Sequence, residues 1–136
     1  MEVKVFNLHE GHRNDFEELL SQLSGKKRAV SMAKNQGVHN VGAFDGNKLV
    51  GFAQIFILPK TTSTLAHLED VVVHRDYRSH GLGRKLVAEA VAVAKRSGAE
   101  SLSLTSRPER VAARELYQSM GFVRPETTVF RMKLDK

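Results

Sequence analysis

The feature that most constrains this chain is a glycine turn that stands between an apolar run and an amphipathic helix. The turn reads Arg-Ser-His-Gly-Leu-Gly over residues 78–83, and three valines occupy positions 71–73. A strand that ends in such a turn lets several backbone N–H groups converge on one anion, because the glycines carry no side chains. The following helix would point the positive end of its dipole at the same place. The pattern therefore predicts a phosphate-binding site.

Hydrophobic periodicity along the rest of the chain predicts a mixed α/β domain. The turn Asp45-Gly46-Asn47, between two apolar runs, is typical of a β-hairpin. Ser106 and Glu109 have the spacing of a capping box, which predicts where the last helix begins. The expected order is strand, helix, three strands, helix, strand, helix and strand, over residues 3–6, 16–23, 38–44, 49–58, 65–73, 81–97, 101–105, 106–120 and 128–134. Such an order predicts a mixed sheet with helices on its faces.

Size and composition predict a single soluble domain over residues 1–136. Apolar residues make up 41% of the chain and charged residues 26%, as in an ordinary globular protein. There is no cysteine, which excludes a disulfide, a thiolate nucleophile and a thiolate metal site. We find neither a membrane-length apolar run nor the pattern of a signal peptide, so we expect a cytoplasmic protein without a membrane partner.

The net charge of +6 fits an anionic ligand and would also fit a nucleic acid. The basic residues are scattered, with one short cluster at 26–28, and no basic–aromatic interleaving marks an RNA-binding sheet. Nucleic-acid binding is therefore the minor alternative. The histidines are scattered as well, so we expect no metal site.

The glycine turn differs from the common nucleotide-binding loops. A Walker loop needs four residues between its glycines and then Lys-Ser or Lys-Thr, which residues 81–85 lack. A dinucleotide fingerprint needs a third glycine where Leu86 stands. The remaining pattern, a basic residue followed by Gly-x-Gly, also occurs in plain strand-to-helix turns. The flanking residues are therefore needed to distinguish a phosphate-binding turn from a plain one.

Those flanking residues resemble the GNAT superfamily of acetyl-CoA-dependent N-acetyltransferases. The stretch 68–73 (Leu-Glu-Asp-Val-Val-Val), the turn 77–83 and the pattern Leu-Tyr-x-x-x-Gly-Phe at 116–122 all match. Arg78, Gly81 and Gly83 fulfil the family's Q/R-x-x-G-x-G/A motif. The resemblance covers nearly the whole chain. It implies the GNAT acyl-CoA N-acyltransferase fold, an α/β fold with a mixed, mostly antiparallel central sheet and helices on both faces.

The resemblance also implies how acetyl-CoA would be held. The backbone of the valine run would bond the pantetheine arm as an added strand does, and residues 79–84 would offer N–H groups to the pyrophosphate. Arg84 and Lys85 would add positive charge, or would form an ordinary solvated helix face. The family commonly has an asparagine where Arg110 stands. The arginine side chain is longer and would reach phosphate or substrate. The implied cofactor-binding residues are Val71, Val72, Val73, Arg78, Ser79, His80, Gly81, Leu82, Gly83, Arg84, Lys85, Arg110 and Ala113.

Three residues are implied for the chemistry. Tyr117 matches the family's tyrosine beside the thioester sulfur and would be the general acid, although its place on an apolar stripe also suits a core aromatic. Glu69 is the first choice for the general base, directly or through water, and His67 the second. In a regular strand these two share one face and Asp70, which we expect to be structural, takes the other. A bulge, frequent in this family, would change that assignment.

The resemblance thus implies an N-acetyltransferase that moves an acetyl group from acetyl-CoA to a primary amine of a small molecule or peptide. Direct attack in a ternary complex is expected, because no cysteine can carry an acyl group. The alternative is a non-catalytic acyl-CoA-binding domain of the same fold. Many family members also form homodimers through their sheets and C-terminal strands.

The acceptor is expected between the first helix, the loop 24–37 and the turn 59–64. The basic residues of that loop suggest an acceptor with an acidic part, or serve only solubility; they are Lys26, Lys27, Arg28 and Lys34. The stretch 67–70 is similar to glucosamine-phosphate N-acetyltransferases. Those enzymes carry an aspartate at about the position of Thr105, so we do not assign that substrate.

Overall fold

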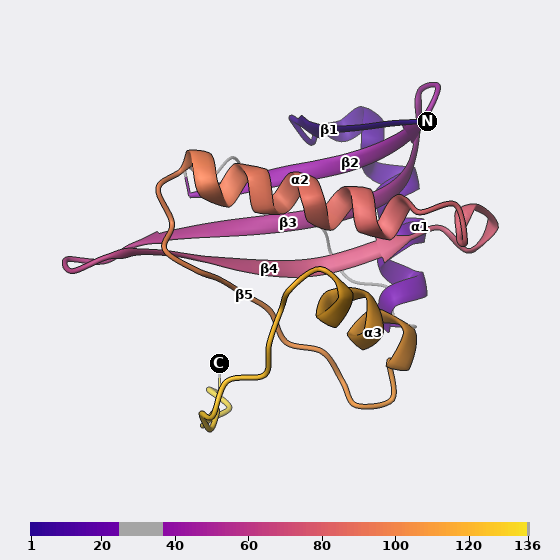
Figure 1. Cartoon of the computed structure of the whole chain (residues 1–136). Helices are drawn as coiled ribbons and strands as arrows, with labels where there is room; N and C mark the ends of the chain where they lie inside the picture. Colours follow the sequence, from indigo (N-terminus) through magenta and orange to yellow (C-terminus); the bar gives the residue numbers. More distant parts are fainter. Residues whose placement is uncertain (25–36, 136) are drawn as a thin grey trace. The chain divides into compact units, whose positions relative to one another are not determined.

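The computed structural model describes residues 1–24 and 37–135 (Figure 1). The expected loop 24–37, with its four basic residues, therefore lies almost entirely outside the described residues. The chain divides into two compact units, residues 1–105 and 106–136, and each is described by itself.

The first unit is built on a five-stranded sheet with the strand order β1-β2-β3-β4-β5. The first three pairings are antiparallel, and β4 and β5 are parallel. The strands are β1 (Glu2–Phe6), β2 (Val38–Asp45), β3 (Lys48–Pro59), β4 (Thr64–Val73) and β5 (Leu102–Ser103). The helices of this unit are η1 (Glu10–His12), α1 (Arg13–Ser24), η2 (Arg75–Tyr77) and α2 (Leu82–Arg96). This mixed, mostly antiparallel sheet confirms the expected fold class, including the hairpin at residues 45–47.

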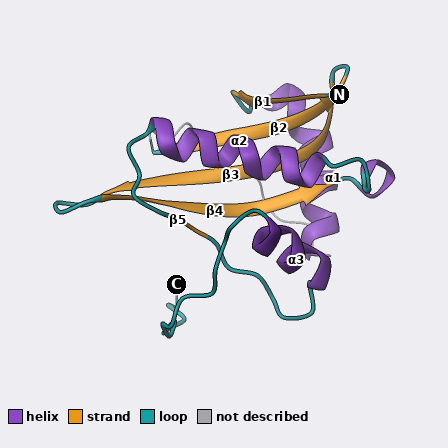
Figure 2. Ribbon diagram, in the orientation of Figure 1, coloured by secondary structure: helices purple, strands orange, loops and turns teal. Residues whose placement is uncertain are grey.

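Helices α1 and α2 lie on opposite faces of the sheet, as Figures 1 and 2 show. The alternation of side chains along β3 explains how both faces are packed. Phe52 is fully buried against Phe16 of α1, with ring centroids 4.5 Å apart. The preceding residue, Gly51, faces the opposite way, where an added Cβ would meet Leu86 of α2 at 3.1 Å. The sheet thus separates two apolar cores.

The register between β3 and β4 shifts beside the predicted catalytic strand. Phe52 lies opposite Val72 and Gln54 opposite Glu69, so β4 has one more residue than β3 over this stretch. Asp70 takes a left-handed φ of 54° within the shift. A β-bulge of this kind bends a strand and re-aims its side chains. The structure therefore contains the bulge that sequence reasoning left open.

The second unit contains one helix, α3 (Val111–Ser119). Arg110 occupies the N-cap position, so the predicted capping box of Ser106 and Glu109 is wrong and the helix begins later than expected. Gly121, with φ of 100°, ends the helix, and the Phe122 N–H donates to the Tyr117 carbonyl.

The predicted last strand, residues 128–134, is also wrong, because the structure has no strand there. Phe130, Met132 and Leu134 alternate with polar residues, but 79–91% of their surface is exposed. Alternation of apolar residues does not by itself supply the backbone partner that a strand needs.

Candidate functional site

The loop between β4 and α2 has the backbone of an anion-binding turn. Ser79 and Gly81 both take left-handed φ values, 67° and 76°, and Gly81 is the N-cap of α2. Alternation of left-handed residues with ordinary ones turns neighbouring N–H groups toward a common concavity. A Cβ added at Gly81 would meet no atom within 4 Å, so the space beside this residue is open. A diphosphate therefore fits the residues present.

The charges around this loop favour an anion. Arg78, Arg84 and Lys85 are exposed, and the first turn of α2 contains no acidic residue. The Arg78 Nε donates to the Val73 carbonyl at 3.1 Å, which ties this guanidinium to the end of β4. The positive end of the α2 dipole adds to these cations.

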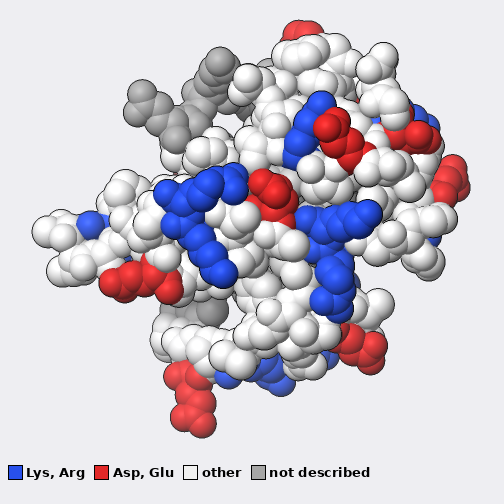
Figure 3. Space-filling view, turned by 45° about the horizontal axis from the view of Figure 1, so that its top comes forward, with Lys and Arg blue, Asp and Glu red and all other residues white. Residues whose placement is uncertain are grey.

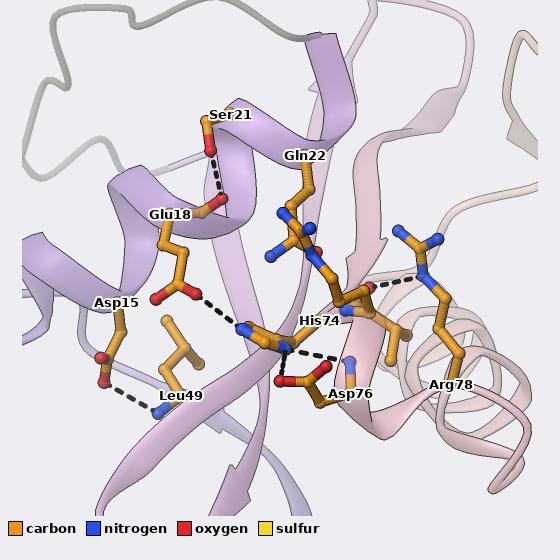
Figure 4. Close-up of polar contacts among 10 residues, drawn as sticks. Asp15, Glu18, Ser21, Gln22, Leu49, His74, Asp76 and Arg78 are labelled. Carbon is orange, nitrogen blue, oxygen red and sulfur yellow. Dashed lines mark hydrogen bonds and ion pairs between the residues drawn. The ribbon is translucent and has the colours of Figure 1, made fainter.

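The start of the loop is fixed to α1 by the buried side chain of His74 (Figure 4). His74 Nδ1 accepts from the Asp76 N–H at 3.1 Å, which leaves Nε2 as the ring nitrogen that donates to Glu18 Oε1, 2.7 Å away. This bond lowers the pKa of the Glu18 carboxyl. The Arg75 N–H donates to Gln22 Oε1 at 2.9 Å, a second contact between the loop and α1.

A second side-chain contact holds the loop from the β2–β3 hairpin. The Tyr77 hydroxyl donates to Asp45 Oδ2 at 2.7 Å, which raises the pKa of Tyr77. His80 lies farther along the loop, and its Nδ1 is 3.1 Å from the Tyr77 carbonyl oxygen. The loop is therefore fixed from two sides, which prepares its N–H groups for a ligand before the ligand arrives.

The part of β4 that leads into this loop extends beyond its pairing with β5. Among the described residues, β5 pairs with β4 only at Ala66 and His67. The predicted pantetheine-binding residues 71–73 come later in β4, beyond that pairing. Free N–H and C=O groups on a strand edge can bond an extended ligand as an added strand would.

The predicted bases lie together on β4. His67 Nε2 is 2.7 Å from Glu69 Oε1, and their side chains are 28% and 44% exposed. Such a pair can take a proton from an attacking amine and pass it on. Asp70, at the bulge, is exposed. The structure thus brings the two predicted bases together.

The predicted acid belongs to the second unit. Tyr117 is half-buried, and its ring meets the edge of Phe122 with centroids 5.9 Å apart. Burial raises the pKa of the Tyr117 phenol, and the charge of Arg110 partly opposes that shift. A phenol that stays protonated can donate to a developing anion. Ala113 is half-buried one turn before Tyr117 on α3, and Arg110 is exposed.

Sequence reasoning missed several polar residues that frame the site. His74 and Glu18 are 56 residues apart, so no local pattern pairs them. Asn40 and Gln54, on β2 and β3, form a hydrogen bond of 3.0 Å beside Glu69. The available signal was a glutamine inside the apolar run 49–58, on the same face as a core phenylalanine.

Together, the mixed sheet, the bulged β4 and the fixed anion loop define an acyltransferase-type domain. A family model, described as acetyltransferase (GNAT) family, matches residues 6–122. The chain therefore belongs to the GNAT acetyltransferase family, as its sequence motifs implied.

Two curated relatives are N-acetyltransferases. The glucosamine 6-phosphate N-acetyltransferase of Trypanosoma brucei brucei is 32% identical over 91 residues, which are 65% of this chain and 58% of that enzyme. The aminoglycoside N(6')-acetyltransferase type 1 of Stenotrophomonas maltophilia is 31% identical over 125 residues, 88% of this chain and 76% of that enzyme. This chain thus spans little more than half the length of the first relative.

A solved structure supports the fold. The crystal structure of a Trypanosoma brucei acetyltransferase superposes with a TM-score of 0.79 at 24% identity, covering 98% of this chain and all of that chain.

The residues that the structure describes contain no cluster of three or more His, Cys, Asp or Glu side chains able to hold a metal ion. None of their helices is both long and apolar enough to cross a membrane. On the face that Figure 3 shows, Lys and Arg side chains form separate groups with acidic side chains between some of them.

Proposed function

We propose that this chain transfers the acetyl group of acetyl-CoA to a primary amine by direct attack in a ternary complex. The observation that carries the proposal is the loop before α2, whose left-handed Ser79 and Gly81 are held in place by contacts to α1 and to the β2–β3 hairpin. A loop fixed in this way can bind a diphosphate without first being ordered, so less binding energy is lost.

The binding residues that we propose are those that the family resemblance implies. The N–H groups of residues 79–84 would bond the pyrophosphate, with Arg78, Arg84 and Lys85 nearby as cations. The open edge of β4 at residues 71–73 would bond the pantetheine arm. On α3, Arg110 and Ala113 would contact the same cofactor. Acetyl-CoA supplies the acetyl group as an activated thioester.

The chain's own side chains would manage the protons. Glu69 would accept the proton that the amine loses on attack, and His67, bonded to it, would orient the carboxylate or take the proton in its place. Tyr117 would donate a proton to the departing thiolate. The amine would attack the thioester directly, since the chain contains no cysteine that could carry the acetyl group.

The acceptor would be a primary amine of a small molecule or a peptide. The two curated relatives named above are described as acting on an amino sugar and on aminoglycosides, which supports a small-molecule amine. We propose a cytoplasmic location, with neither nucleic acid nor membrane as partner. We also propose a homodimer, an assembly that many members of the family form.

Calorimetry with acetyl-CoA, followed by thiol release with a panel of amines, tests the proposal. We expect saturable acetyl-CoA binding at a 1:1 ratio, and CoA release that depends on an added amine. Binding without amine-dependent release would identify a non-catalytic acyl-CoA-binding domain instead. A chain that fails to bind acetyl-CoA would contradict the proposal entirely.

A further inference from the structure

Three polar side chains form a row across the middle of the sheet. Asn40 on β2 lies opposite Gln54 on β3, and Gln54 lies opposite Glu69 on β4. Residues that lie opposite each other project from the same face of a sheet. Gln54 also shares its face with Phe52, which packs on α1. The row therefore continues the α1 side of the sheet beyond its apolar core.

The side chains of this row are only partly satisfied by one another. Gln54 Nε2 donates to Asn40 Oδ1 at 3.0 Å, and both residues are half-buried. This bond uses one N–H of Gln54 and the oxygen of Asn40, so each amide has a further group that can form hydrogen bonds. The Asn40 amide nitrogen and the Gln54 amide oxygen are therefore the groups of the row that could bond a ligand.

The position of the row favours a compact ligand. Both β2 and β3 are paired on each side, so their backbones offer no free edge to an extended peptide. Recognition there must come from side chains. Gln54 is one strand spacing from Glu69 and Asn40 is two, or about 5 and 10 Å. Those distances match hydroxyl groups on the same small molecule as the amine.

An aromatic residue stands next to the row. Phe56, opposite His67, is half-buried and shares the face of Gln54. An aromatic surface beside amide and carboxylate groups suits a molecule with both C–H and O–H faces.

We propose that Asn40 and Gln54 bind hydroxyl groups of the acceptor and that the acceptor is a polyhydroxylated amine, such as an amino sugar, with its amine at Glu69. This inference rests on the proposed acetyltransferase function and specifies its substrate class. The hydroxyls would accept from the Asn40 amide nitrogen and donate to the Gln54 amide oxygen.

The test compares two ring amines of similar size, glucosamine and cyclohexylamine, of which only glucosamine carries hydroxyls. We expect the full chain to have a higher kcat/KM with glucosamine. Replacing Gln54→Leu should lower the ratio of the two kcat/KM values about tenfold, because one hydrogen bond to the acceptor is lost. Asn40→Ala removes the other amide of the Asn40–Gln54 pair, which lies on β2, and should also lower the ratio. Asn47→Ala, in the exposed hairpin turn, is the matched control and should leave the ratio unchanged.

Acetyl-CoA binding, measured by calorimetry on every variant, separates this inference from the proposed function. If acetyl-CoA binds and an amine is acetylated, but cyclohexylamine or a peptide N-terminus is preferred, the acceptor inference is wrong and the acetyltransferase function stands. An unchanged ratio in both folded variants would also overturn the inference. Loss of acetyl-CoA binding by the unaltered chain would overturn the proposed function itself.

Discussion

At the scale of single residues, neighbouring carboxylates on β4 have different environments. Glu69 contacts His67 and belongs to the polar row, whereas Asp70 occupies the left-handed position of the bulge. Both are acidic and adjacent in sequence, so composition cannot assign the base. The register shift between β3 and β4 makes the distinction.

We therefore predict opposite results for two amide substitutions on β4. Glu69→Gln removes the proton acceptor and should lower kcat by about 100-fold or more, with acetyl-CoA affinity within about twofold of wild type. Asp70→Asn, the matched control, keeps a residue type that tolerates a left-handed φ and should retain most of kcat. Steady-state thiol release measures both, and a greater loss in Asp70→Asn would contradict the assignment.

A second residue-scale prediction concerns Tyr117. Because burial raises the pKa of its phenol above the ordinary value of 10.0, the acid stays protonated at neutral and mildly alkaline pH. Wild-type kcat should therefore show no alkaline decline between pH 7 and 9 from this group. Tyr117→Phe should lower kcat by about 100-fold at every pH in that range. A variant with wild-type kcat would leave Tyr117 as a core aromatic.

At the scale of elements, the anion loop combines local and distant determinants. Its glycines and basic residues follow one another in the sequence and could be predicted. The contacts that fix it reach back to α1 through His74 and to the β2–β3 hairpin through Tyr77. Those contacts depend on the packing of distant segments, which no local pattern encodes.

Substitutions of two glycines with similar backbones distinguish the effect of backbone strain on stability from an effect on acetyl-CoA binding. Gly81 and Gly46 both have positive φ, 76° and 58°, and an added Cβ would meet no atom within 4 Å at either position. Alanine at each should cost about 1–2 kcal/mol of unfolding free energy. Only Gly81→Ala should also weaken acetyl-CoA binding, by about tenfold or more, because its methyl group occupies the open space of the loop. Equal affinities in the two variants, by calorimetry, would contradict the placement of the pyrophosphate.

The contact between α1 and the loop predicts an acid-sensitive stability. The hydrogen bond from His74 lowers the pKa of Glu18 below its ordinary value of 4.5 in the folded chain. This contribution to stability is therefore present above about pH 4.5 and is lost as the pH falls through the folded pKa. Denaturant unfolding between pH 6 and 3 should show a shallower loss of stability in Glu18→Gln than in wild type. The same slope in both would contradict the contact, and Glu17→Gln, on the same helix, should keep the wild-type slope.

At the scale of the whole molecule, the order of the five strands and three α-helices could be predicted, because each is marked by periodicity or turn residues. The α1 helix, the β2–β3 hairpin and the helix after the glycine turn are of this kind. The start of α3 and the absence of a strand at residues 128–134 could not. In both cases a local pattern, a capping box and an alternation, lacked the partner contacts that would have formed it.

The residues of the candidate site also differ in whether the sequence could predict them. The sequence motifs indicated most of the residues that we propose for acetyl-CoA binding, since one turn and one strand carry them. The polar row of Asn40, Gln54 and Glu69 required the register of three strands. The residues that we propose for acceptor recognition lie on separate elements. The sequence therefore indicated the family but not the acceptor.

The most direct test of the central claim is mass spectrometry of a reaction that contains the chain, isotope-labelled acetyl-CoA and glucosamine. We expect the wild-type chain to place one labelled acetyl group on the amine nitrogen, and Glu69→Gln and Tyr117→Phe to form much less of this product. If acetyl-CoA binds but no amine of the panel becomes labelled, the proposed acetyltransferase function is contradicted.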